Sequence, residues 1–151
     1  MSDMDDLYQE VLLEHAKSKR RKFKPAGSCS CVQGFNPLCG DEVSFYVVLK
    51  DGVVSEASFE GQGCAISQAS ASMAAQQSTG LDVKEARRQL GLALSWVVTG
   101  AGDRAALDDW EALGGVSRFP MRVKCATMPI RAALAALGLP AGDTLELGDA
   151  P

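Results

Sequence analysis

A tight-turn signal between two strand-like segments sets the strongest limit on how this chain folds. Residues 43–50 alternate apolar and polar side chains, Asp51-Gly52 follows, and residues 53–60 have the composition of a returning strand. An Asp-Gly pair between such segments is a strong signal for a two-residue hairpin, because both residues tolerate the positive φ angles of the turn. The sequence therefore predicts an antiparallel hairpin over residues 43–60.

The register of this hairpin decides which side chains share a face. Direct pairing across the turn would place the apolar side chains of the first strand beside polar side chains of the second. One extra residue in the second strand, a β-bulge near Ser55-Glu56, repairs this mismatch. In the repaired register Phe45 lies opposite Phe59, and Val47 lies opposite Ala57.

The predicted register also brings two cysteines together at the open end of the hairpin. Cys39 lies shortly before the first strand and Cys64 shortly after the second, so that Cys64 falls opposite Gly40, one step from Cys39. Cys125 follows much later, and the spacing of the three cysteines matches no short zinc motif such as a pair of C-x-x-C elements. Isolated buried cysteines are therefore an alternative interpretation of the three thiols.

Turns and glycines around the cysteines favour a shared site over isolated thiols. Each of the three cysteines sits where a turn gives way to a predicted helix or strand, and Asp41 follows Cys39 after a single glycine. Glycine allows the backbone to turn so that neighbouring side chains can point the same way. We predict that four side chains form one metal or cluster site: Cys39, Asp41, Cys64 and Cys125.

The mixture of ligands indicates which metal chemistry such a site supports. Zinc accepts sulfur and oxygen ligands in a tetrahedral arrangement, and an iron–sulfur cluster usually takes four thiolates. A carboxylate is a harder ligand than a thiolate, so one aspartate in a sulfur-rich set suits a site that must open or accept sulfur. Arg122 and Lys124, close to Cys125, either offset the negative charge of the thiolates or are ordinary surface cations.

Composition and charge argue against several other classes of protein. The chain has 151 residues, which suggests one domain over 1–151 with a flexible tail over 141–151. Its net charge is −4, and it has no basic block outside Lys17 to Lys24. No nucleic-acid partner is therefore expected. No apolar run approaches the ~20 residues of a membrane span, and the acidic first residues do not resemble a signal peptide. We therefore expect a cytoplasmic protein, in which thiols stay reduced. Five cysteines cannot all pair with one another, which favours metal ligands or reactive thiols over disulfides.

Helical periodicity accounts for most of the remaining chain. Apolar spacing, capping patterns and terminal glycines predict helices over residues 4–17, 65–79, 82–99 and 103–113. A last helix is expected after Cys125 and ends near Leu137.

The segment between the first helix and the hairpin is harder to interpret. Residues 17–37 lack a regular pattern, and their basic run is either a solvated linker or a docking patch for an acidic partner. Cys29 and Cys31 lie in an edge strand or a variable loop, although a C-x-C pair can also bind metal. His15, on the apolar face of the first helix, is predicted to be a packed or surface residue and not a ligand.

Three motifs, in order around the three cysteines, resemble the U-type iron–sulfur cluster assembly proteins. They are residues 36–41 (Asn36-Pro37-Leu38-Cys39-Gly40-Asp41), residues 59–72 around Gly61-Gln62-Gly63-Cys64, and residues 119–127 around Arg122-Val123-Lys124-Cys125. The first helix is similar as well, so the resemblance covers roughly residues 5–137. Lys124 stands where IscU proteins carry a histidine, and the stretch from Cys64 to Cys125 is long, as in SufU. The chain therefore resembles the SufU branch more than the IscU branch.

The resemblance implies an α+β fold in which a small antiparallel β-sheet packs against several α-helices. It implies zinc, or an iron–sulfur cluster, on Cys39, Asp41, Cys64 and Cys125, with Cys39 as the acceptor of persulfide sulfur. The implied donor is a pyridoxal-phosphate cysteine desulfurase of the SufS type, one histidine of which takes a zinc position and frees the acceptor thiol. The chain would then be a scaffold or a zinc-dependent sulfurtransferase that works with this desulfurase and with downstream recipients. The alternative is a structural zinc module without sulfur transfer.

Overall fold

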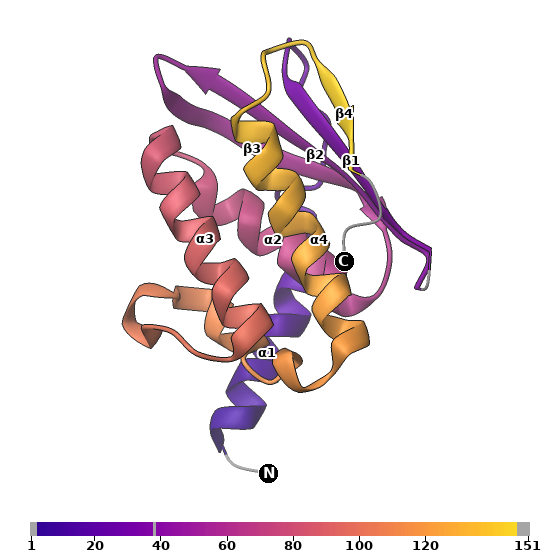
Figure 1. Ribbon diagram of the computed structural model, residues 1–151, viewed down its shortest axis with the longest axis vertical. Helices are drawn as coiled ribbons and strands as arrows, with labels where there is room; N and C mark the ends of the chain where they lie inside the picture. Colours follow the sequence, from indigo (N-terminus) through magenta and orange to yellow (C-terminus); the bar gives the residue numbers. More distant parts are fainter. Residues whose placement is uncertain (1–2, 38, 148–151) are drawn as a thin grey trace.

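The structure, a computed structural model, describes residues 3–37 and 39–147 and combines one β-sheet with several helices (Figure 1). Its main elements are α1 (Asp3–Lys17), β1 (Ser30–Asn36), β2 (Asp41–Lys50), β3 (Val53–Gln62), α2 (Ala65–Ser78), α3 (Val83–Thr99), α4 (Pro120–Leu137) and β4 (Thr144–Glu146). Three short 3-10 segments connect α3 to α4: η1 (Arg104–Ala106), η2 (Asp108–Leu113) and η3 (Val116–Arg118). The α+β architecture is confirmed, and the helix predicted over 103–113 is replaced by η1 and η2.

The four strands lie in the order β3-β2-β1-β4, and the helices cover one face of the sheet (Figure 1). The pairs β1–β2 and β2–β3 are antiparallel, whereas β4 runs parallel to β1. Helix α4 packs across β1 and β2, and α2 packs against β3. The sheet is therefore mixed, which corrects the prediction of an antiparallel sheet at its β4 edge.

The β2–β3 hairpin has the predicted register and the predicted bulge. Phe45 pairs with Phe59, Val47 pairs with Ala57, and the register shifts just beyond Val48, where the second strand has one extra residue. The turn residues before β3 both have positive φ, as an Asp-Gly hairpin requires. The bulge keeps the apolar side chains of both strands on the face that packs against the helices.

Strand β1 is the main element that the sequence did not predict. Cys31 lies inside this strand, between β2 and β4, where it pairs with Tyr46 and Thr144. Cys31 therefore lies in an inner strand and not at an edge, whereas Cys29 lies in the loop just before β1, one of the two predicted alternatives. The apolar signal of β1 is weak because the buried face carries Ser30, Val32, Gly34 and Asn36, whereas Phe35 is 56% exposed.

The short strand β4 lies within the segment for which the sequence predicts a flexible tail. The backbone N–H of Leu147 donates to the carbonyl of Gln33 (2.8 Å), and the N–H of Cys31 donates to the carbonyl of Asp143 (3.1 Å). The side chains of Thr144–Glu146 are all exposed, so these backbone contacts hold the strand in the sheet. Residues 148–151 of the predicted tail lie outside the described residues.

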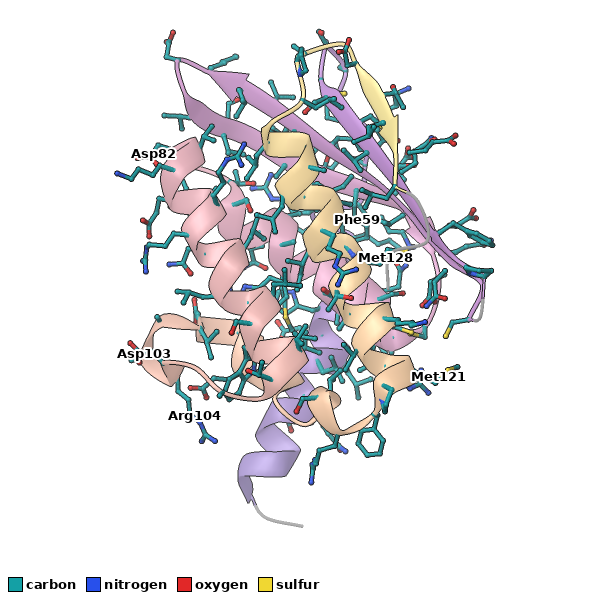
Figure 2. The ribbon with its side chains drawn as sticks, viewed as in Figure 1. Phe59, Asp82, Asp103, Arg104, Met121 and Met128 are labelled. Carbon is teal, nitrogen blue, oxygen red and sulfur yellow. The ribbon has the colours of Figure 1, made fainter. Side chains whose placement is uncertain are left out.

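Helix α3 begins and ends as the capping pattern predicts. The Asp82 side chain accepts a 2.7 Å hydrogen bond from the backbone N–H of Glu85, and Gly100 ends the helix in the left-handed conformation. Figure 2 shows Asp82 and Asp103 near opposite ends of this helix. Within the described parts of the chain, no helix is both long and apolar enough to cross a membrane.

Helix α2 packs closely against its neighbours because most of its side chains are small. Its buried positions are Ser67, Ala69, Ser70, Ala71, Ser72, Met73, Ala74, Ala75 and Ser78. It contacts α1, α4 and β3, and the Ser70 hydroxyl donates a 2.6 Å hydrogen bond to the backbone carbonyl of Ala126 on α4. This contact holds α2 against α4, and two of the predicted ligands lie on these elements: Cys64 at the N-cap of α2 and Cys125 within α4.

Candidate metal centre

Asp41, the first residue of β2, lies at the centre of the candidate site. Its side chain is completely buried. Its Oδ1 accepts a 2.8 Å hydrogen bond from the backbone N–H of Cys64, and its Oδ2 lies 3.8 Å from Cys64 Sγ. A buried carboxylate requires compensation for its lost hydration, and the Cys64 N–H supplies only part of it.

Cys64 is the N-cap of α2, as the sequence predicted from its position before the helix. The Cys64 sulfur accepts a 3.5 Å hydrogen bond from the backbone N–H of Ser67. The Ser67 hydroxyl in turn donates to the carbonyl of Cys64 (3.0 Å), which fixes the first turn.

Cys125 occupies a different position in the chain from the one predicted. The sequence placed it in front of the last helix, but α4 begins at Pro120, so Cys125 lies inside the helix. Proline is favoured in the first turn of a helix, where its missing N–H is not needed. Cys125 is fully buried, and its Sγ lies 3.4 Å from Cys39 Sγ.

The four predicted ligands therefore converge, although they come from a turn, a strand and two helices. The potential ligand atoms of Cys39, Asp41 and Cys125 all lie within 4.8 Å of one another. Cys64 adjoins this group through its contact with Asp41 Oδ2. The alternative of isolated buried cysteines does not describe this arrangement.

The electrostatics of the cluster fit a bound cation. Burial raises the pKa of the Cys125 thiol, and the hydrogen bonds that this thiol donates to Asp41 and Cys39, together with the nearby Cys64, raise the pKa further. Three thiols and a buried carboxylate cannot all be anionic at such short distances without a compensating positive charge. A divalent metal ion supplies that charge and accepts this set of sulfur and oxygen donors. Arg122 and Lys124 are exposed near the N-terminus of α4.

His15 lies outside this cluster and is packed, as predicted. The side chain is 7% exposed, with Nδ1 2.8 Å from Ser72 Oγ and Nε2 2.8 Å from Asp109 Oδ2. These contacts join α1 to α2 and to η2. The sequence did not identify Asp109 as the partner, because the two residues are 94 positions apart.

Replacing His15 with alanine should destabilise the protein by about 1–3 kcal/mol, because Ser72 is left buried without its partner and Asp109 loses its partner. Urea denaturation followed by circular dichroism measures the change. Glu10→Ala, at an exposed position of the same helix, is the control. A loss for His15→Ala no larger than that for Glu10→Ala would contradict a role for His15 in joining the helices.

Cys29 and Cys31 are remote from the candidate centre along β1. Cys31 lies near the start of β1, whereas Asn36 at the other end of the strand pairs with Asp41. Burial raises the pKa of the Cys31 thiol, and the neighbouring Cys29 raises it further. Neither thiol belongs to the group formed by Cys39, Asp41 and Cys125.

Comparison with known proteins identifies the family. The NifU-like N terminal domain matches residues 7–126, which include all four predicted ligands. The chain belongs to the NifU-like N-terminal domain family. The family match spans most of the structure, from α1 to the middle of α4.

Individual relatives support the same family assignment. The chain is 40% identical over 133 residues to the zinc-dependent sulfurtransferase SufU of Bacillus subtilis. The aligned residues make up 87% of this chain and 89% of that protein. It is 35% identical over 119 residues to the iron–sulfur cluster assembly scaffold protein IscU of Thermotoga maritima, covering 79% and 84% of the two chains. The crystal structure of FiSufU from Fervidobacterium islandicum AW-1 superposes with a TM-score of 0.80 at 31% identity, covering 91% of this chain and 99% of that one.

Proposed function

We propose that this family member serves iron–sulfur cluster assembly by binding zinc at the metal centre and accepting persulfide sulfur on Cys39. The convergence of three thiols and one buried carboxylate carries the proposal. The proposed ligands are Cys39, Asp41, Cys64 and Cys125, and this donor set suits zinc in a tetrahedral site. Bound zinc holds the thiols in their deprotonated form at neutral pH. Two relatives bear names for related roles, a zinc-dependent sulfurtransferase and a cluster scaffold.

The backbone around the three thiols supports Cys39 as the sulfur acceptor. Cys64 is fixed at the start of α2, and Cys125 is buried within α4. Cys39 instead lies half-buried in the turn between β1 and β2, followed by Gly40 with a φ of 70°. A side chain on such a turn can move toward a donor without disturbing a packed helix.

The proposed transfer is a thiol–persulfide exchange that needs no further oxidant or reductant. The Cys39 thiolate attacks the terminal sulfur of a cysteine persulfide on the donor, and a new S–S bond forms on Cys39. The S–S bond of the donor breaks, and its electron pair leaves with the donor cysteine as a thiolate. Arg122 and Lys124, exposed near the N-terminus of α4, are the cations proposed to support this transfer.

The proposed donor is a pyridoxal-phosphate cysteine desulfurase of the SufS type, and downstream proteins receive the sulfur or the cluster. The basic run from Lys17 to Lys24 is a candidate contact for this donor. Lys22 Nζ donates a 2.9 Å hydrogen bond to Gln68 Oε1, which places the run beside the first turns of α2. Cys64 caps that same helix, so these cations lie on the side of the molecule that carries the metal centre. We therefore propose that they contact an acidic surface of the desulfurase near its active site.

Metal and sulfide measurements on protein purified without oxygen test the proposal. We expect about one zinc per chain, and sulfane sulfur on Cys39 after incubation with the desulfurase and cysteine. Mass spectrometry of the peptide that contains Cys39 locates the added sulfur. Sulfur found on Cys64 or Cys125 but not on Cys39 would contradict the acceptor assignment.

Two other outcomes of these measurements favour different functions. Iron and acid-labile sulfide in place of zinc indicate a scaffold on which a cluster is built, as the name of the IscU relative describes. Stoichiometric zinc with no sulfur uptake indicates a structural zinc module that only binds a partner.

A further inference from the structure

The two carboxylate oxygens of Asp41 have different surroundings. Oδ1 accepts the hydrogen bond from the backbone N–H of Cys64 at 2.8 Å, whereas Oδ2 lies near the thiols, 3.8 Å from Cys64 Sγ. The Cys64 N–H belongs to the N-terminus of α2, so its position is set by the packing of the helix. Because this N–H orients Oδ1, Oδ2 is the oxygen that faces the Cys64 thiol.

Gly63 provides the space that this arrangement needs. A Cβ atom at position 63 would overlap Asp41 Oδ1 and would lie 2.6 Å from Ser67 Oγ. Ser67 cannot move away freely, because its hydroxyl donates to the Cys64 carbonyl (3.0 Å). The φ angle of Gly63 lies outside the left-handed region, so the constraint on this residue is steric and not conformational.

We infer that Gly63 is a positioning residue that makes Asp41 a one-oxygen ligand and thereby selects a four-coordinate metal. The inference rests on the proposed function, since it concerns the same metal centre. Three thiolates and one oxygen complete the four positions of tetrahedral zinc. A carboxylate that binds through both oxygens raises the coordination number, which suits metals that prefer more oxygen ligands. A side chain at position 63 displaces Oδ1 from the Cys64 N–H and frees the carboxylate to rotate.

Gly63→Ala tests the inference through metal binding. We expect zinc affinity to fall about 10–100-fold in competition with a chelator, the usual cost of losing a residue that orients a ligand. In the Co²⁺-substituted protein we expect weaker visible absorption, because five- and six-coordinate Co²⁺ absorbs far less strongly than four-coordinate Co²⁺. Gly27→Ala is the matched control, since a Cβ there meets nothing within 4 Å.

A double-mutant cycle with Asp41→Ala separates positioning from general misfolding. If Gly63 acts through Asp41, then Gly63→Ala causes no further loss of zinc affinity in the Asp41→Ala background. Wild-type affinity and an unchanged Co²⁺ spectrum in Gly63→Ala would overturn the inference, and so would an equal loss in both backgrounds. Wild-type protein that binds neither zinc nor Co²⁺ would overturn the proposed function as well, so the two failures are distinguishable.

Discussion

Replacing Cys39 with alanine should abolish the stimulation of desulfurase turnover by this protein and leave its fold intact. Cys39 lies in a turn and not in a packed element, so its side chain contributes little to the core. Without its sulfur no new S–S bond can form, and the donor persulfide is not discharged. Turnover is measured as alanine released from cysteine by the desulfurase, with and without the variant.

Cys29→Ala is the control for this experiment, because Cys29 is another half-buried cysteine and lies outside the metal centre. It should stimulate the desulfurase as the wild type does. Thermal melts of both variants are needed, since loss of a metal ligand can also lower stability when metal binding is coupled to folding. Stimulation by Cys39→Ala at the wild-type level would show that Cys39 is not the acceptor.

Replacing Asp41 with alanine should weaken metal binding by more than about tenfold, or lengthen the lifetime of a bound cluster. The substitution removes the oxygen ligand and also leaves the backbone N–H of Cys64 without its acceptor. Zinc affinity is measured by chelator competition, and cluster lifetime by the decay of visible absorption after reconstitution with iron and sulfide.

Asp41→Asn distinguishes the ligand role of Asp41 from its structural role. Asparagine keeps an oxygen that accepts from the Cys64 N–H, but it lacks the anionic oxygen that a metal prefers. If Asp41 is a ligand, Asp41→Asn loses metal affinity while its melting temperature without metal stays close to that of the wild type. Unchanged metal affinity together with unchanged cluster lifetime, in both variants, would remove Asp41 from the ligand set.

The parts of the fold that were predictable are those that nearby residues control. The Asp-Gly turn and the side-chain alternation around it were sufficient to predict the β2–β3 pairing. They also predicted the bulge, the one extra residue that β3 has opposite the step from Val48 to Leu49. The capping residues Asp82 and Gly100 likewise marked the ends of α3. In each case the contacts that stabilise the element join residues close in sequence. The local sequence pattern was therefore sufficient to predict the element.

The parts that were missed depend on distant residues or on a signal with two meanings. Strand β1 has few apolar side chains of its own, and it forms because β2 and β4 satisfy its backbone on both sides. Cys125 was predicted to precede the last helix because Pro120, which is typical of loops, was assigned to the loop before it. Proline favours the first turn of a helix as well, and this signal would have placed Cys125 inside α4.

The candidate site combines the two kinds of information. Local pattern was sufficient to propose Cys39, Asp41, Cys64 and Cys125 as candidate ligands and to bring the ends of one hairpin together. The hydrogen bond from Cys64 to Asp41 Oδ1, the missing side chain at Gly63 and the arrival of Cys125 beside Cys39 appear only once α2 and α4 pack on the sheet. Turn residues and side-chain periodicity depend on interactions between residues close in sequence, so the sequence alone was sufficient to predict them. Distances between side chains from separate elements are set by how those elements pack, and packing depends on the whole core at once.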